Sequence, residues 1–571
     1  MHYNLVKASN RRYLEELNNR NHEMPVVYNA INTIQETAWV INKKIFNVIK
    51  TCLENNWTLG QLPVNYITME EQLPPKPFDI ATNKEALSKW KSEAKKIHEK
   101  VHQSKSKYIQ VRRIVEEAEL FLGTSEFYYP HQYDFRSRIY PKPAMLSPQG
   151  ADYSRACLLF KYGKPMGSEE NYWAYAVNGA NLFGEVDKEE VSVRVKWVED
   201  NTDRIIATAT NPFEDTWWTK ADKPYCFLAW AFEFAEFNSW EDDEGFTCSP
   251  KFITTIPIQS DCSNSGLQHY SAMMLDEQGG FATNLTPSNK PQDIYNLVAE
   301  KVKAKLSTMT NPLAKQWLEY GINRKICKKP VMCLPYSLTR FSCRKYIEEH
   351  LKKEFADRNV SYEVFRISEI DDGVFKATNF LTPIVWDSIT NAIPKATEIM
   401  SYIKTIAKLV ASENLPVCWT TPLNFPVQMM SYETESKRVK TKMGDSIVKL
   451  SIQSYTDKIS KRLTSQAVVP NYIHSLDSSV LQLATVKAKD MGVDNFSMIH
   501  DSFGVVAPDV AIMAKALREA FCEIYEEDVL KKFADEMYVM LSAKNQAKFP
   551  TMPTKGNLDL QQVKKSVFFC I

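Results

Sequence analysis

Two apolar segments that each end in a single aspartate place the strongest constraint on how this chain can fold. Residues 495–505 are rich in β-forming side chains up to His500 and Asp501, after which apolar residues resume. This pattern predicts a β-hairpin whose tight turn carries Asp501 at its tip. A carboxylate held out of an apolar hairpin into a cleft is costly without a positive charge nearby, and a divalent metal ion is the usual source. The alternative is that Asp501 is only a turn former.

The second segment, residues 256–269, has the same design. An apolar strand runs into Asp261, and a Ser/Asn/Gly loop then leads into a helix-like stretch from Leu267 to Leu275. Although they are far apart in sequence, Asp261 and Asp501 could meet in one site and hold two metal ions. Two metals that clamp the attacking and the leaving oxygen are the device of nucleotidyl transfer.

Length and composition bound the class of protein. With 571 residues, 44% hydrophobic and 24% charged, the chain predicts an ordinary soluble globular protein of two to four domains. The formal net charge of +1 means that any nucleic-acid footprint must be local. The most apolar run, residues 225–237, is broken by Glu233 and Glu236, and the first residues lack the apolar core of a signal peptide. We therefore expect a cytoplasmic protein without membrane contact.

The cysteines give a separate expectation. There are eleven of them, an odd number, with no Cys-x-x-Cys and no paired spacing. This pattern predicts reduced thiols rather than a disulfide framework or a zinc site.

Two basic segments are candidates for nucleic-acid contact. Residues 84–113 predict a long helix with many more lysines and arginines than acids, which is either a solvated face or a helix that tracks phosphates. Residues 432–462 alternate around Gly444-Asp445 and predict an exposed hairpin, a shape that fits the major groove of DNA. The basic residues that this hairpin would offer to DNA are Lys437, Arg438, Lys440, Lys442 and Lys449.

Arginine and aromatic residues are interleaved in residues 127–140. Arg136 and Arg138 are two apart, so on an extended segment they point the same way and suit adjacent phosphates, while the aromatic side chains could stack on bases. The alternative is an aromatic strand at the edge of a core.

Residues 324–337 carry a further candidate site. Arg324 and Lys328 are four apart and share one helix face, which suits a triphosphate, and Tyr336 could face a sugar or a base. A surface helix with basic residues is the alternative. Pro330 and Pro335 predict a break or irregular turn just before Tyr336.

The remaining pattern is mostly helical. Helical spacing links Ile31, Ile34, Ala38 and Ile41 and continues to Ile49; most of residues 151–255, 291–307 and 343–412 also predict helices. Residues 470–477 predict the start of a helix with Ser475 or Asp477 near its cap, and His474 there is either a core histidine or a site residue.

The order of these motifs resembles that of the single-subunit RNA polymerases of bacteriophages and mitochondria, in particular the phage type. Residues 261–269 are similar to motif A of that family, residues 324–341 to motif B and residues 500–504 to motif C. Asp-Phe-Arg-Ser-Arg at 134–138 is similar to the Asp-x-Arg-Gly-Arg template-contact motif. The likeness runs from about residue 24 to the end.

The resemblance implies an α+β, mostly helical right-hand polymerase with thumb, palm and fingers and a small antiparallel palm sheet. The implied parts are an N-terminal helical segment at 1–38, a thumb-like region at 39–125, a palm at 126–290 and 475–571, and fingers at 291–474 that include the specificity hairpin 432–462.

The implied activity is DNA-directed RNA synthesis with two Mg²⁺ ions, in the cytoplasm of an infected bacterial host. Asp261 and Asp501 would bind the metals, and Arg324, Lys328 and Lys188 would hold the nucleoside triphosphate. Tyr336 and His474 would face its sugar. The implied contacts to template, transcript or promoter DNA are Arg136, Arg138, His500, Arg438, Lys440 and Lys442. The enzyme would be a monomer, with an accessory protein for promoter opening as an option.

Three rival functions follow from the same residues. DNA polymerases of family A carry glutamate five residues beyond the motif A aspartate, where this chain has Gly266, so the position leaves room for a ribose 2′-OH. The other rivals are a non-catalytic, decayed polymerase, which the intact catalytic side chains oppose, and the catalytic part of a split or partner-dependent enzyme acting on single-stranded or pre-melted DNA. The short stretch before Asp134 keeps the latter open as an alternative.

The chain differs from the family at three positions where the family usually has glycine. Cys262, Ser137 and Ser337 stand at these positions. If those positions need close backbone approach or positive φ, the serines require compensating geometry.

Overall fold

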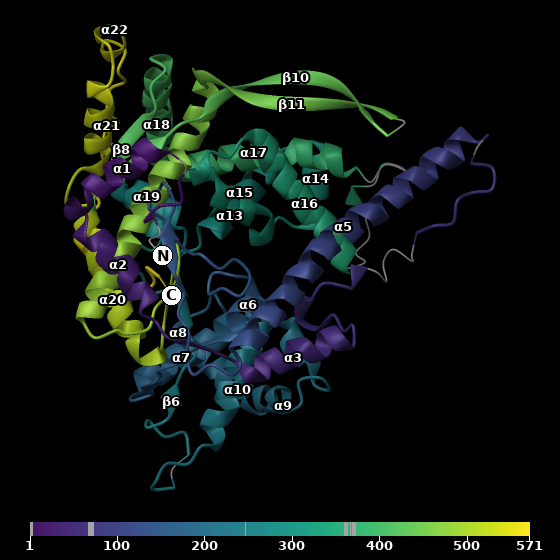
Figure 1. Ribbon diagram of the computed structural model, residues 1–571, viewed down its shortest axis with the longest axis vertical. Helices are drawn as coiled ribbons and strands as arrows, with labels where there is room; N and C mark the ends of the chain where they lie inside the picture. Colours follow the sequence, from purple (N-terminus) through teal and green to yellow (C-terminus); the bar gives the residue numbers. More distant parts are fainter. Residues whose placement is uncertain are drawn as a thin grey trace.

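Within the mostly helical structure of Figure 1, a small three-stranded antiparallel sheet joins the two aspartate segments. Its order is β12 (Ser497–Ile499), β13 (Ser502–Val505) and β7 (Ile258–Asp261). The computed structural model describes residues 4–570 except residues 9, 67–72, 81, 246, 359–363, 366, 368–372 and 445. Strands β12 and β13 form the predicted hairpin, with His500 at a φ of 54° in the turn.

The sheet lies between two hydrophobic cores. Met498, Phe503 and Val505 pack into the first core, whereas Ile258 of β7 packs into the second. Because β7 and β13 are hydrogen-bonded to each other, the turn of the hairpin and the end of β7 are held at the boundary between these cores.

The first core is built mainly from helices. It includes α1 (Arg11–Asn19), α2 (Pro25–Gln35), α11 (Ser265–Met274), α12 (Glu277–Ala282), α13 (Ile294–Ser307), α14 (Pro312–Tyr320), α15 (Arg324–Cys333), α16 (Arg340–Arg358), α17 (Val374–Ala392), α18 (Pro394–Ser412), α19 (Lys461–Asp490), α20 (Val510–Ile524) and α21 (Val529–Val539), with α22 (Ala543–Gln546) following along the chain. Two short hairpins also contribute: β2 (His131–Tyr133) with β3 (Ile139–Pro141), and β8 (Val417–Thr420) with β9 (Pro426–Met429).

The second core is smaller and rich in aromatic residues. It includes β1 (Trp39–Ile41), α3 (Lys43–Glu54), α6 (Asp152–Ala156), β4 (Leu158–Phe160), α7 (Glu169–Phe183), α8 (Val191–Asp200), α9 (Thr202–Thr210) and α10 (Pro224–Ser239). Strands β5 (Lys164–Pro165) and β6 (Ile253–Thr254) pair beside it. Within the described residues, no helix combines the length and apolar character needed to cross a bilayer.

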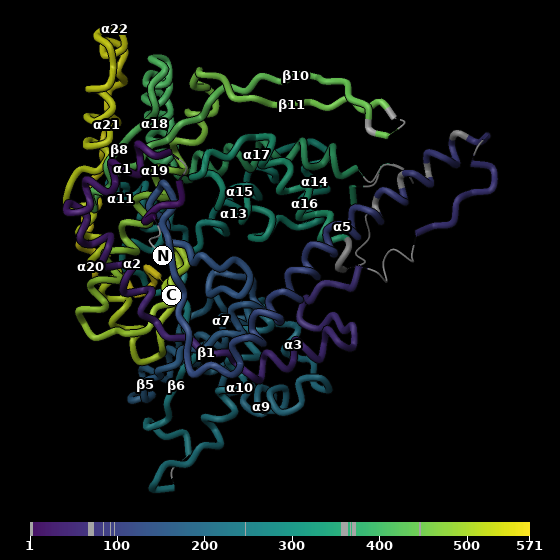
Figure 2. The backbone as a smooth tube through the Cα atoms, in the orientation of Figure 1, coloured from purple at the N-terminus to yellow at the C-terminus, as the bar shows by residue number. Residues whose placement is uncertain are grey.

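Two elements extend away from the cores toward the same side of the molecule (Figure 2). One is α5 (Lys84–Phe121), which confirms the predicted basic helix and continues beyond it. The other is the ribbon of β10 (Tyr432–Met443) and β11 (Ser446–Ile459), which confirms the predicted hairpin. Residue Asp445 of its predicted turn lies outside the described residues.

The structure corrects three predictions of secondary structure. Helix α2 ends at Gln35, residues 39–41 form strand β1 paired with β4, and α3 begins at Lys43, so the prediction of one continuous helix through residues 31–49 was wrong at residues 36–42. Pairing with β4, distant in sequence, overrides the local helical spacing.

Residues 134–138 are also not extended. They form the turn between β2 and β3, closed by hydrogen bonds from the backbone N–H of Asp134 to Arg138 O and of Ser137 to Asp134 O. The third correction concerns residues 470–477: α19 already begins at Lys461, capped by the Ser460 side chain, so Ser475 and Asp477 lie buried in mid-helix.

The predicted break before Tyr336 is confirmed. Helix α15 ends at Cys333, a 3-10 turn spans Leu334–Tyr336, and Ser337 follows with a φ of 64°. Pro335 lies at the start of that turn, where its missing N–H costs little.

Of the three residues that replace the family's usual glycines, two have a strained backbone conformation. Ser137 and Ser337 have φ values of 67° and 64°, in the left-handed region that favours glycine. The Ser137 side chain is fully buried and its hydroxyl has no hydrogen-bond partner, while its carbonyl accepts from Ser478 Oγ and Gln482 Nε2. These two contacts use the backbone and do not depend on the serine side chain.

We expect Ser137→Gly to raise the free energy of unfolding by about 1 kcal/mol, because removing the Cβ relieves the left-handed strain by more than the unfolded chain gains in entropy. Ser137→Ala is the matched control, since it removes the unpaired hydroxyl and keeps the Cβ. Urea unfolding of the three proteins measures both effects. Equal gains in the two variants would contradict a role for backbone strain.

Candidate active site

The antiparallel register of the three-stranded sheet brings the two predicted acids together. Ser502 of β13 pairs with Asp261 of β7, and the backbone N–H of Cys262 donates to Asp501 O at 3.2 Å. Both aspartates line one cavity of about 560 Å³. The expectation that these residues meet in one site is therefore confirmed by their placement.

The two carboxylates have different surroundings. Burial, followed by the negative charge of Asp477 and a smaller effect from Asp261, raises the pKa of Asp501 to about 7, although Arg138 opposes this. Asp261 is 58% exposed and its carboxylate lies 3.8 Å from Lys223 Nζ. Lys223 was missed by the sequence analysis, because it precedes α10 and belongs to no segment that carried a signal.

Six cationic side chains line the same cavity: Arg155, Lys188, Arg194, Lys223, Arg324 and Lys328. Arg324 Nε lies 2.5 Å from Asp293 Oδ2, and its guanidinium lies over the Tyr295 ring at 5.1 Å. Burial and the neighbouring charges of Arg324 and Lys188 lower the pKa of Lys328. Arg324 and Lys328 thus share one face of α15 as predicted, and that face borders the cavity rather than bulk solvent.

Lys188 reaches the cavity from the loop after α7. Its ammonium lies 2.9 Å from Asp187 Oδ2, an exposed pair that leaves donor capacity on the nitrogen. Asp293, which caps α13 and holds Arg324, gave no signal in the sequence because its partner lies 31 residues away.

Tyr336 packs between two parts of the site. Its ring lies 4.8 Å from the ring of His474, and burial raises its pKa. A Cβ built on Gly266 would come within 2.8 Å of Pro335 Cβ and 3.2 Å of the Tyr336 hydroxyl. The absence of a side chain at 266 therefore lets the turn before Tyr336 approach α11 closely.

His474 is a partly buried hydrogen-bond acceptor. Arg136 donates to His474 Nδ1 at 2.9 Å, and burial together with the charges of Arg138 and Arg136 lowers the pKa of His474 to about 3. The imidazole is therefore neutral at physiological pH. His500 has a similar setting, with a pKa lowered to about 4 by burial and by Arg138, and its ring contacts Tyr140 at 4.8 Å.

Arg136 and Arg138 are both engaged inside the protein. Arg136 forms an ion pair of 2.6 Å with Asp134, and Arg138 forms one of 2.6 Å with Asp477 on α19. Burial disfavours the ionised form of Asp477, but the neighbouring His269, Arg138 and Ser265 outweigh it and lower the pKa of this carboxyl. Asp477 was assigned only a capping role from the sequence, because its partners become neighbours only in the fold.

The remaining predicted residues do not line the cavity. Arg438, Lys440 and Lys442 are exposed on β10, opposite Ser451, Lys449 and Ile447 respectively, so they share one face of the ribbon. The structure thus gathers Asp261, Asp501, Lys188, Arg324 and Lys328 around the cavity and leaves the ribbon separate from it.

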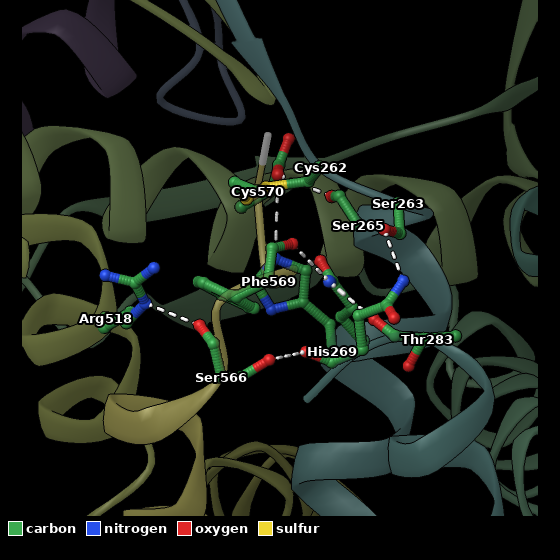
Figure 3. The surroundings of a disulfide bond; sticks show 12 residues. Cys262, Ser263, Ser265, His269, Thr283, Arg518, Ser566, Phe569 and Cys570 are labelled. Atoms are coloured by element: carbon green, nitrogen blue, oxygen red, sulfur yellow. Dashed lines mark hydrogen bonds and ion pairs between the residues drawn. A yellow bond between two sulfur atoms is a disulfide. The ribbon is translucent and has the colours of Figure 1, made fainter. Parts of the chain in front are cut away.

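One prediction about the cysteines was wrong. Cys262 and Cys570 form a disulfide bond, with their Cα atoms 4.2 Å apart (Figure 3). The other nine cysteines are free. Sequence spacing gave no signal because the two residues are 308 positions apart. Cys262 also differs from Ser137 and Ser337 in that its φ is not positive.

Comparison with known proteins places this chain in a family. The family described as DNA-dependent RNA polymerase matches residues 164–548. The chain belongs to the DNA-dependent RNA polymerase family. It is 34% identical to the T7 RNA polymerase of Escherichia phage T7 over 95% of this chain, and 32% identical to the DNA-directed RNA polymerase of Enterobacteria phage K11 over 98% of it. It is also 30% identical to DNA-directed RNA polymerase 2B, chloroplastic/mitochondrial, of Nicotiana tabacum over 96% of the chain.

The chain spans 64% of the length of the two phage relatives and 52% of the tobacco one. Membership of the polymerase family, together with the mostly helical architecture and small antiparallel sheets, confirms the expected right-hand polymerase fold class. A solved structure, "POL domain of Pol1 from M. smegmatis complex with DNA primer-template and dNTP", has a TM-score of 0.41 at 10% identity over 90% of this chain and 70% of that one, too low to add to the assignment.

The raised pKa of Asp501 predicts a pH-dependent cost to stability in the absence of metal. An aspartate with an ordinary pKa near 3.9 when unfolded and about 7 when folded favours the folded state at low pH, and this contribution is lost as pH rises from about 4 to about 7. Asp501→Asn removes the charge. We therefore expect its gain in unfolding free energy over the natural chain to be larger at pH 8 than at pH 5, by about 1–2 kcal/mol.

Urea unfolding with a chelator present, at several pH values, measures this difference. Parallel stability curves for the two proteins across pH 5 to 8 would contradict the assignment of a desolvated carboxylate at Asp501.

Proposed function

We propose that the chain is a DNA-directed RNA polymerase that transfers ribonucleoside monophosphates from nucleoside triphosphates to an RNA 3′ end, and that it transcribes phage genes. The observation that carries this proposal is the convergence of two acids, Asp261 and Asp501, with the cations Arg324 and Lys328 on one cavity. Acids alone would suit many metal sites, and cations alone many phosphate sites. Together they suit a triphosphate whose α-phosphate lies at a metal centre.

The acids fit a pair of Mg²⁺ ions. A carboxylate whose pKa is raised to about 7 by burial gains from a cation that restores its ionised form. Within the described residues no group of three or more His, Cys, Asp or Glu side chains is arranged to hold a metal. Mg²⁺ is commonly held by one or two carboxylates, with water and substrate phosphates completing its six ligands. When bound, the two ions would lower the pKa of the RNA 3′-OH and stabilise the leaving pyrophosphate.

The cations and Tyr336 would orient the bound nucleotide, with its triphosphate toward the cations and its sugar toward Tyr336. Arg324 would contact the phosphates as a bidentate donor, with Lys328 and Lys188 as point charges along the triphosphate. The lowered pKa of Lys328 favours proton donation to the departing pyrophosphate. Tyr336, steadied by the neutral imidazole of His474, would face the sugar with its hydroxyl beside Gly266.

The nucleic-acid contacts follow from the remaining basic residues. Arg136, Arg138 and His500 would border template or hybrid, with Arg138 held in place by Asp477. The basic face of the ribbon, with Arg438, Lys440 and Lys442, would read promoter DNA in the major groove. We assign the thumb, palm and fingers to the ranges given above, and we place the enzyme, as a monomer, in the cytoplasm of an infected bacterial host. An accessory protein for promoter opening is part of this proposal.

Asp501→Ala should abolish RNA extension on a primed RNA:DNA scaffold and leave scaffold binding within about twofold, because it removes a metal ligand and no phosphate contact. Asp490→Ala, at the exposed end of α19, is the matched control and should extend normally. Single-nucleotide extension in gels and fluorescence anisotropy measure the two properties. Persistent extension by the Asp501 variant would remove the metal assignment.

Tyr336→Phe should keep ribonucleotide incorporation within about tenfold of the natural chain and reduce discrimination against deoxynucleotides by about tenfold or more, since one hydroxyl hydrogen bond is lost. The ratio of kcat/KM values for each NTP and dNTP on the scaffold gives the result. Tyr402→Phe on α18, outside the cavity lining, serves as the control. An unchanged ratio for the Tyr336 variant would exclude sugar sensing by this residue.

A further inference from the structure

The disulfide joins the active-site sheet to the last described segment of the chain. Cys262 directly follows Asp261 at the end of β7, and Cys570 lies beside it as an isolated antiparallel bridge (Figure 3). The bond therefore ties residues 566–570 to the strand that carries one of the two catalytic acids.

Several non-covalent contacts hold this segment against the body. Gln268 Nε2 donates to Phe569 O at 3.1 Å, Arg518 Nε donates to Ser566 O at 2.8 Å, and the Ser566 hydroxyl donates to Asn284 O at 2.7 Å. The Phe569 ring packs against Phe521 at 5.0 Å. These contacts dock the segment up to residue 569, and the disulfide adds a covalent anchor at residue 570.

The bond bears directly on the geometry of the acids. Asp261 is more than half exposed and its ion pair with Lys223 is long, so few side-chain contacts hold its carboxylate and the backbone sets the positions that it can reach. The next residue, Cys262, is also the one whose N–H donates to Asp501 O. A covalent restraint on Cys262 therefore restrains the backbone that connects both acids.

Small thiols can reach the Cys262–Cys570 disulfide from the side of the active-site cavity. Cys262 lines the active-site cavity, whereas Cys570 is 6% exposed. A small thiol or disulfide that enters the cavity reaches the Cys262 sulfur first.

We propose that Cys262 and Cys570 form a reversible redox site that couples docking of residues 566–570 to the position of Asp261. In the oxidised form the segment is locked beside β7. In the reduced form it is held only by its non-covalent contacts and opens more often, which loosens the backbone at the acids.

The chemistry balances with a small disulfide as the oxidant. The Cys262 thiol loses its proton and attacks glutathione disulfide, forming a mixed disulfide and releasing one glutathione thiol. Cys570 then loses its proton and attacks the Cys262 sulfur, forming the intramolecular bond and releasing the second glutathione thiol. Two cysteine thiols are thus oxidised by two electrons, and one glutathione disulfide is reduced to two thiols.

The experiment compares the full chain equilibrated with dithiothreitol or with glutathione disulfide. Peptide mapping by mass spectrometry without reduction should find the peptides of Cys262 and Cys570 cross-linked only in the oxidised sample. The oxidised protein should melt a few degrees higher, and amides in residues 560–569 should exchange about tenfold more slowly. These readouts do not depend on catalysis.

The effect on activity rests on the proposed function. The Mg²⁺ concentration for half-maximal RNA extension should be at least about threefold lower for the oxidised protein than for the reduced protein, because the acids are better positioned. Extension that is absent in both states, with the cross-link and the exchange difference present, would count against the proposed function and leave the redox site standing.

Two variants make the test specific. Cys570→Ser should lose every response to glutathione disulfide, whereas Cys248→Ser, at an exposed free cysteine, should keep them all. If Cys570→Ser fails to fold, the comparison of oxidised and reduced natural protein remains decisive. Absence of the cross-link in the oxidised natural chain, or equal melting and exchange in its two forms, would overturn the proposal, as would a Cys570 variant that still responds.

Discussion

The antiparallel pairing of β7 with β13 places Asp261 opposite Ser502 and therefore beside Asp501, and the site depends on this register. A shift by one residue would turn every side chain of β7 to the opposite face, moving Ile258 out of the second core and Asp261 away from the cavity. The register is secured from both sides, since Met498, Phe503 and Val505 are buried in the first core. Apolar packing thus fixes the position of two charged groups.

The electrostatics of the site follow from that position. Burial of Asp501, together with the nearby negative charges of Asp477 and Asp261, raises the pKa of Asp501 to about 7, so a bound cation would favour its ionised form. Asp477 is itself compensated by Arg138, Ser265 and His269, which makes it a fixed part of the scaffold. Across the cavity, Arg324 and Lys328 supply the opposite charge. The site is thereby arranged for an anionic substrate that arrives with divalent metal.

At two positions that differ from the family pattern, contacts elsewhere in the fold offset a locally unfavourable backbone conformation. Ser137 and Ser337 adopt left-handed backbone that glycine would accept more easily, and both buried hydroxyls lack partners. The turn at Ser137 persists because its carbonyl binds Ser478 and Gln482 on α19. At the third position, Cys262 has no such strain and forms a covalent link instead.

The sequence by itself determined the local features of this protein: the hairpin with Asp501 at its turn, the strand ending in Asp261, the shared helix face of Arg324 and Lys328, the break before Tyr336, the basic ribbon and helix, and the family resemblance. Each of these rests on periodicity, turn chemistry or motif spacing within a short segment. Only the tertiary structure decided that residues 39–41 are a strand, that Arg136 and Arg138 lie in a turn and pair with Asp134 and Asp477, that Lys223 faces Asp261, and that Cys262 binds Cys570. These features depend on partners or on chain reversals that no local pattern encodes, because the fold brings together groups that are distant along the chain.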